Sequence, residues 1–247
     1  MPEEITLEPL EFPEAIRAFG ERVVISPEAF KALDEQTRAA AFTMGKVSEL
    51  QLIAGAKEGL ERALSEGGTF ADFKNDFGAL ANKLGITPLS PHYLETVFLN
   101  GVQSSYHAGR WEQQQEVKEL RPFLSYFTVG DDRVRPHHAA LHGVTLPADH
   151  PRWQSIYPPN GHRCRCRVQS FSRTEAERRG LEVLDDLPEV RPVKMKVFDR
   201  FQRKFVTVTE QVEPRPDPGW AFNPGDPVAR KAALDALERK LRREILS

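Results

Sequence analysis

Cysteine is nearly absent from this chain, which has two in 247 residues, Cys164 and Cys166. Only one residue separates them, so a bridge between them would close a small, strained ring, and a disulfide framework is excluded. We expect both thiols to be reduced, either free or bound to a metal. Long apolar runs are also missing, and the first residues lack the basic and apolar pattern of a secretion signal. These absences predict a soluble protein made in the cytoplasm.

The chain also lacks a strong net charge. Lysine and arginine number 34 against 36 acidic residues, giving a formal charge of -2. This balance excludes a polycation that binds nucleic acid over its whole surface, so any such contact must be local. Residues 133–173 nevertheless contain seven arginines, no lysine, no glutamate and one aspartate. The sequence therefore predicts a basic middle region.

Helix signals dominate the first half of the chain. Start signals at Ser26, Thr69 and Ser90 are each followed by apolar residues at helical spacing. They predict helices from residue 27 to about 44, from 70 to 84, and a long one from 91. The simplest use of their apolar stripes is the core of a helical bundle.

The composition changes after Pro122. The following segments predict a strand over 123–129, a short helix over 135–142, a Cys-Arg strand that runs to Phe171, and a short helix from Ser172 to Gly180. Residues 188–227 contain seven prolines and one predicted strand pair, 194–198 with 204–209, and a helix begins after Asp226. We expect an α+β fold: a helical N-terminal region (1–118), a small mixed α/β core (119–187), and a proline-rich arm with a C-terminal helix (188–247).

Two neighbouring segments form the most specific pattern in the chain. Residues 131–143 read D-D-R-V-R-P-H-H-A-A-L-H-G, and residues 158–167 read P-P-N-G-H-R-C-R-C-R. Side chains alternate between the two faces of an extended segment. Both cysteines would then lie on one face, and Arg163, Arg165 and Arg167 on the other.

This block resembles the central signature of the phage Mu F-like minor head proteins, D-x-R-x-R-P-x-H-x-x-L-x-G followed by P-P-x-G-x-x-C-R-C. Other segments resemble family landmarks in the family's order: 12–16, 41–44, 99–110 and 217–225. Leu99-Asn100-Gly101 stands where the family commonly has Arg-Thr-Asn, so a role tied to that arginine does not carry over. The resemblance covers almost the whole chain and implies a head morphogenesis protein of tailed phages or prophages.

A metal site is the first candidate site. If residues 135–142 are helical, His138 and His142 share a face, and with Cys164 and Cys166 they could complete a tetrahedral Cys2His2 structural zinc site. Only His138 matches the signature firmly. The histidines that compete for the last position are His142, His162 and His137. The alternative is a packed core of buried thiols and hydrogen-bonded histidines. No other cofactor is expected.

Catalysis is the second candidate. Asp131, Asp132, His138 and Cys164 could supply an orienting acid, a base and a nucleophile. No nuclease, protease or nucleotide-binding pattern accompanies them. We expect a protein without enzymatic activity, and the alternative is a zinc-dependent nuclease or another processing enzyme of phage origin.

DNA contact is the third candidate. Five arginines, with Arg152 nearby, could hold phosphates without reading bases: Arg133, Arg135, Arg163, Arg165 and Arg167. They could equally pair with Asp131, Asp132 and Asp149 and fix the loops. No helix-turn-helix or finger pattern predicts sequence-specific binding.

The resemblance also implies partners and a location. Family members are associated with the portal and with the packaged DNA, and their genes lie beside those of the portal and major capsid proteins. We therefore expect a minor head protein of the virion, at or near the portal, with the portal protein, the major capsid protein and non-specifically bound DNA as partners. No membrane partner is expected.

Overall fold

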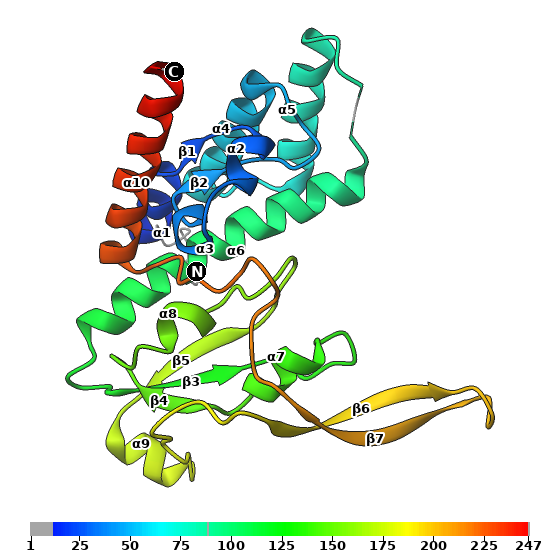
Figure 1. Cartoon of the computed structure of the whole chain (residues 1–247), viewed down its shortest axis with the longest axis vertical. Helices are drawn as coiled ribbons and strands as arrows, with labels where there is room; N and C mark the ends of the chain where they lie inside the picture. Colours follow the sequence, from blue (N-terminus) through cyan, green and yellow to red (C-terminus); the bar gives the residue numbers. More distant parts are fainter. Residues whose placement is uncertain (1–11, 88, 247) are drawn as a thin grey trace, which may run out of the picture.

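The computed structural model describes residues 12–87 and 89–246. In the N-terminal half, four helices surround an apolar core (Figure 1): α1 (Pro13–Gly20), α4 (Leu50–Glu66), α5 (Phe70–Lys83) and α6 (Pro91–Glu116). Each helix contributes buried side chains to this core, among them Phe19, Leu60, Phe73 and Leu94.

Local capping explains where two of these helices begin. Thr69 and Asp72 form the predicted capping box at the start of α5, and the Ser90 hydroxyl accepts the Tyr93 N–H at the start of α6. The helices predicted from residues 70 and 91 are therefore confirmed. Helix α4 was not predicted, and it ends at Gly67, whose φ of 75° favours glycine.

The single helix predicted from residue 27 to about 44 is wrong. The segment contains α2 (Pro27–Lys31), α3 (Glu35–Arg38) and strand β2 (Ala41–Phe42). Asp34 starts the second helix, because its carboxylate accepts the Thr37 N–H at 2.9 Å. The chain then becomes extended because β2 pairs in parallel with β1 (Val23–Val24).

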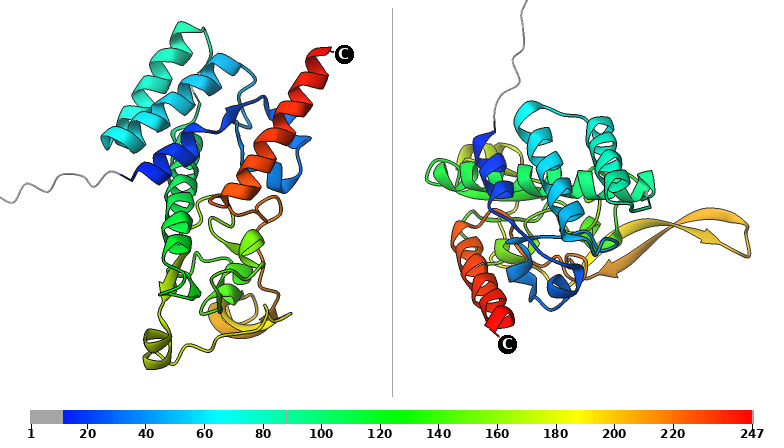
Figure 2. Two further views of the ribbon diagram at one scale, coloured as in Figure 1. Left: turned by 90° about the vertical axis from the view of Figure 1, so that its left-hand side faces the viewer. Right: turned by 90° about the horizontal axis from the view of Figure 1, so that it is seen from above.

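Helix α6 joins the two parts of the molecule. It has 26 residues, a length of about 39 Å at the α-helical rise, and it runs alongside both parts (Figure 2). Its first turns pack in the helical core, whereas near its end Trp111 packs edge to face on Tyr157, with ring centroids 4.9 Å apart. The Gln114 amide also donates to the Val168 carbonyl at 3.0 Å. The helix therefore fixes the second part against the first.

A three-stranded antiparallel sheet organises the second part. Strand β3 (Phe123–Phe127) lies between β4 (Thr145–Pro147) and β5 (Arg167–Phe171). The sheet is accompanied by the short helices α7 (Pro136–Leu141), α8 (Trp153–Ile156) and α9 (Arg173–Arg178). Leu124, Tyr126 and Trp153 are fully buried in its core. The predicted strand is thus confirmed over residues 123–127 and the predicted helix over residues 136–141, each shorter than expected.

The segment that contains both cysteines is less regular than predicted. Strand β5 begins only at Arg167, and Arg163 has a left-handed φ of 56°, so the chain turns before the strand. The predicted alternation of exposure is confirmed from residue 164 onward. Cys164 and Cys166 are buried, whereas Arg165 and Arg167 are exposed.

A β-hairpin extends away from the sheet (Figure 1). It consists of β6 (Arg191–Asp199) and β7 (Lys204–Val212), which confirm the predicted strand pair and lengthen it. The chain then returns to α10 (Pro227–Leu246), where Leu237 is buried with Ile25 and Leu33 of the helical half.

The α+β class and the predicted helical N-terminal half and C-terminal helix are confirmed. The boundaries at residues 118 and 187 stay a prediction. Among the helices of residues 12–87 and 89–246, none combines the length and apolar character needed to cross a bilayer.

Candidate functional site

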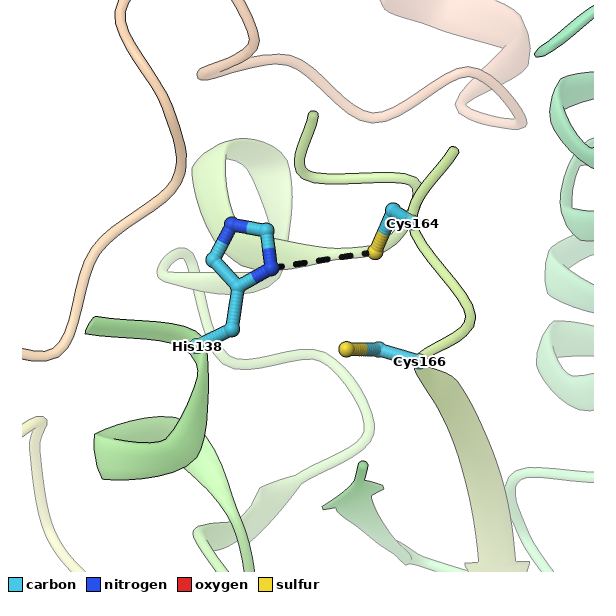
Figure 3. Close-up of side chains that lie close together, drawn as sticks. All are labelled: His138, Cys164 and Cys166. Carbon is cyan, nitrogen blue, oxygen red and sulfur yellow. Dashed lines mark hydrogen bonds between the residues drawn. The ribbon is translucent and has the colours of Figure 1, made fainter. Parts of the chain in front are cut away.

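One histidine and both cysteines form a buried cluster in the second part (Figure 3). His138 comes from α7, and Cys164 and Cys166 come from the turn before β5. Their exposed fractions are 2%, 2% and 5%. One potential ligand atom from each residue lies within 4.8 Å of the other two, and His138 Nδ1 is 3.9 Å from Cys164 Sγ. The structure therefore brings together three of the four residues predicted for a zinc site.

His142 does not join this cluster. Helix α7 ends at Leu141, and His142 has a ψ of 126°, so it leaves the helical face that it was expected to share with His138. Its Nδ1 instead accepts the Thr128 N–H at 3.1 Å, and its ring packs edge to face on Phe127. The predicted i, i+4 pair is lost because the helix stops one residue too early.

Asn160 fixes the orientation of His138. The His138 Nε2 lies 3.0 Å from the Asn160 carbonyl, and a carbonyl can only accept, so Nε2 carries the proton. Nδ1 is the ring nitrogen that faces Cys164. The Asn160 side-chain amide also donates to the Tyr126 hydroxyl at 3.1 Å and to the Ile156 carbonyl at 2.9 Å. Asn160 thus holds both the His138 ring and the Tyr126 hydroxyl in place.

The two thiols are hydrogen-bonded to each other. The hydrogen bond with the Cys166 thiol lowers the pKa of Cys164, and the same bond raises the pKa of Cys166. The Tyr126 hydroxyl also hydrogen-bonds Cys166, and burial raises the pKa of that hydroxyl. Cys164 is therefore the more acidic thiol of the pair.

His107 of α6 lies behind the cysteines. Its ring is buried, hydrogen-bonds the backbone of Cys166 and packs edge to face on Tyr157. Burial lowers the pKa of His107 to about 4, so the ring is neutral at pH 7. It supports the turn that carries Cys166.

Asp217 was not predicted as a site residue, yet it lies beside His138. It belongs to the return segment, residues 213–226, which connects β7 to α10. Its carboxylate accepts from His137 Nε2 at 2.6 Å and from Arg135 Nε at 3.2 Å, and it lies 3.5 Å from His138 Nε2. Its backbone N–H donates to the Asn160 carbonyl at 2.8 Å. Asn160 lies within residues 158–167 and Asp217 within residues 217–225, two segments that resemble the family. This resemblance was the sequence signal that could have identified both residues.

The acids proposed for catalysis do not reach the cluster. Asp131 holds Arg165 through two contacts of 2.6 and 2.8 Å, and this hydrogen-bonded pair lowers the pKa of Asp131. Asp132 pairs instead with Lys196 of β6 at 2.8 Å. The structure therefore does not bring these two acids together with His138 and Cys164.

Most of the five arginines proposed for DNA contact already have partners. Arg165 pairs with Asp131, Arg135 with Asp217, and Arg163 with Glu95. The Arg167 guanidinium lies 5.7 Å from the centroid of the Phe127 ring. Arg133 has 83% of its side chain exposed, and its guanidinium lies 3.6 Å from the Asp131 carboxylate.

These pairs fit the loop-fixing alternative in part. Asp131 acts as expected, but Asp132 pairs with a lysine, and Arg152 pairs with Asp186 at 2.7 Å rather than with Asp149. Contact with DNA stays a prediction.

Comparison with known proteins gives one family. Residues 55–169 match the family described as "Phage Mu protein F like protein". The "Putative capsid assembly protein F" of Escherichia phage Mu is 33% identical over 226 residues, which cover 82% of this chain and 51% of that protein. The "Mu-like prophage FluMu F protein" of Haemophilus influenzae is 29% identical over 232 residues, covering 85% and 56%.

The chain spans about half the length of these two curated relatives. A shorter match, 46% identical over 44 residues, covers 17% of this chain and 7% of an uncharacterized protein of Methanocaldococcus jannaschii. No solved structure matches significantly.

Proposed function

This chain belongs to the phage Mu F-like family, and from that membership we propose that it acts in the assembly of a phage or prophage head as a minor, non-catalytic component. The observation that carries the proposal is the 33% identity to a putative capsid assembly protein over 82% of this chain. That match is too long to reflect one shared motif. The ion-paired states of Asp131 and Asp132 also favour a structural role over catalysis.

The β6–β7 hairpin (residues 191–212), called the arm below, supports a role in contacting other head components. Near its tip, Phe201 is fully exposed, and Phe198 and Phe205 pair edge to face while remaining half exposed or more. Large exposed apolar groups gathered at one place are typical of contact surfaces. The arm extends away from the sheet, so it can reach a neighbouring subunit while the body stays folded (Figure 1).

The finer proposal is a position at or near the portal, with the portal protein and the major capsid protein as neighbours. In that position the protein is needed in few copies, and it meets the DNA that is packaged or ejected. The exposed side chains of Arg133 and Arg167 support such a contact.

Particle composition tests the assembly role. In the phage or prophage that encodes this chain, purified particles should contain it in far fewer copies than the major capsid protein. Deletion of its gene should still allow shells to form, because the major capsid protein is unchanged. The infectious yield should fall at least about tenfold, because the particles then lack this minor component. Quantitative mass spectrometry and plaque counts measure the two effects.

The arm supplies a matched comparison in the same experiment. Complementation with a Phe201→Ser variant should restore less infectivity than complementation with Leu120→Ser, which alters an exposed leucine outside the arm. Particles that contain none of this protein, or as much of it as of the shell subunit, would refute the proposed role.

DNA contact has its own test. Binding through phosphates alone should be indifferent to sequence and should weaken steeply as salt rises. The double change Arg133→Glu and Arg167→Glu should weaken binding of a labelled duplex at least about fivefold by fluorescence anisotropy. Arg62→Glu, in the helical half, is the control. Absence of binding at low salt would remove DNA from the proposal and leave the assembly role intact.

A further inference from the structure

We propose that His138, Cys164 and Cys166 bind one zinc ion, with a water molecule as the fourth ligand. The first observation is the donor set. Two sulfurs and one imidazole nitrogen suit zinc, and they exclude magnesium and calcium, which require oxygen ligands. All three side chains are nearly completely buried, and they come from two different segments of the chain.

The spacing of the donors fits a tetrahedral ion. Zinc bonds of about 2.3 Å to sulfur and about 2.0 Å to nitrogen place two such ligand atoms about 3.6 Å apart. The observed distance from His138 Nδ1 to Cys164 Sγ is 3.9 Å, and the three ligand atoms lie within 4.8 Å of one another. Movements of no more than about 1 Å would therefore complete the coordination.

The surroundings prepare His138 as a ligand. Histidines that bind metals usually donate their second ring N–H to a carbonyl or a carboxylate, which fixes the ring and exposes the other nitrogen. His138 meets this condition, because its Nε2–H donates to the Asn160 carbonyl while the Asp217 carboxylate lies 3.5 Å away. The remaining nitrogen, Nδ1, faces Cys164 (Figure 3).

A small cavity beside the cluster provides the fourth position. Its volume is about 20 Å³, which is enough for one water molecule. It is lined by the three donor residues and by Val129, Arg133, Val134, Arg135, Arg163 and Arg165. Neither His142 nor Asp217 can take this position, because His142 leaves the cluster and Asp217 lies beside Nε2, the nitrogen that faces away from the sulfurs.

The ion would hold together a region with little regular structure. Residues 157–166 form no strand or long helix, yet they cross the core between α8 and β5. Zinc would tie this segment to α7 and keep the arginines at 163 and 165 in place. The assignment is independent of the proposed role in head assembly.

Metal analysis of the intact purified protein tests the assignment. Protein prepared without chelator should contain about one zinc per chain. Replacement of zinc by Co²⁺ should give the visible bands of a tetrahedral site and the near-ultraviolet bands of thiolate-to-cobalt charge transfer. Removal of zinc from the wild type should lower Tm by at least about 5 °C, and zinc addition should restore it.

Single substitutions then identify the ligands. Cys164→Ser, Cys166→Ser and His138→Gln should each reduce Co²⁺ affinity at least about a hundredfold, whereas His142→Gln should keep the wild-type spectrum. If a ligand variant does not fold, the wild-type titration still decides. Wild-type protein that binds neither metal, a cobalt spectrum without thiolate bands, or loss of metal in His142→Gln would each overturn the assignment.

Discussion

Trp153→Ala should lower the free energy of unfolding by about 3–5 kcal/mol. Trp153 is fully buried in the sheet core, where its ring packs edge to face on Tyr157 and its Nε1–H donates to the Pro147 carbonyl at 2.8 Å. Alanine would leave a cavity between α8 and the sheet and an acceptor without its donor. Urea unfolding followed by circular dichroism measures the loss.

Trp220→Ala is the control, because it makes the same tryptophan-to-alanine change at a less buried position. Trp220 lies on the return segment, partly exposed, and packs against His162 and Phe222. Its removal should cost less than half as much, because solvent already reaches the ring. Equal losses for the two variants would mean that the core around Trp153 is not packed as described.

Asn160→Ala should have the second-largest effect, about 2–4 kcal/mol of unfolding free energy. The change removes both hydrogen bonds of the side-chain amide, those to the Tyr126 hydroxyl and the Ile156 carbonyl. Asn160 is fully buried, so water does not readily replace the lost donor. The Tyr126 hydroxyl, which also touches Cys166, would lose its fixed direction.

Asn75→Ala is the matched control, because Asn75 is exposed on α5. It should change stability by no more than about 0.5 kcal/mol. Urea unfolding of both variants under one buffer condition gives the difference. A loss at residue 160 no larger than that at residue 75 would contradict the hydrogen-bond network described behind the cluster.

Local signals in the sequence predicted much of the fold. The capping boxes at Thr69 and Ser172 act within four residues, and both helices begin where the sequence indicates. The failure over residues 27–44 has a different cause. There the pairing of β1 with β2 joins residues 18 positions apart, for example Val23 with Ala41, and this contact overrides the local helical pattern.

The candidate site was likewise predicted only in part, because some of its contacts are local and others join distant segments. The family motif gave His138, Cys164 and Cys166, and the structure brings them together. The expectation for His142 depended on one more residue of helix, which α7 does not have. Asp217 lies 80 positions beyond His137, which it contacts, and no spacing rule predicts a contact across such a separation.

The family, the α+β class, the expectation of reduced thiols one residue apart and the order of most helices and strands could all be inferred from the amino-acid sequence. These follow from local geometry and from a motif that is read without knowing where the chain goes. Packing of distant segments sets which histidine faces the sulfurs, which acids pair with the arginines, and how Asn160 and Asp217 support the cluster. Buried polar groups must find hydrogen-bond partners, and the available partners depend on which segments pack together.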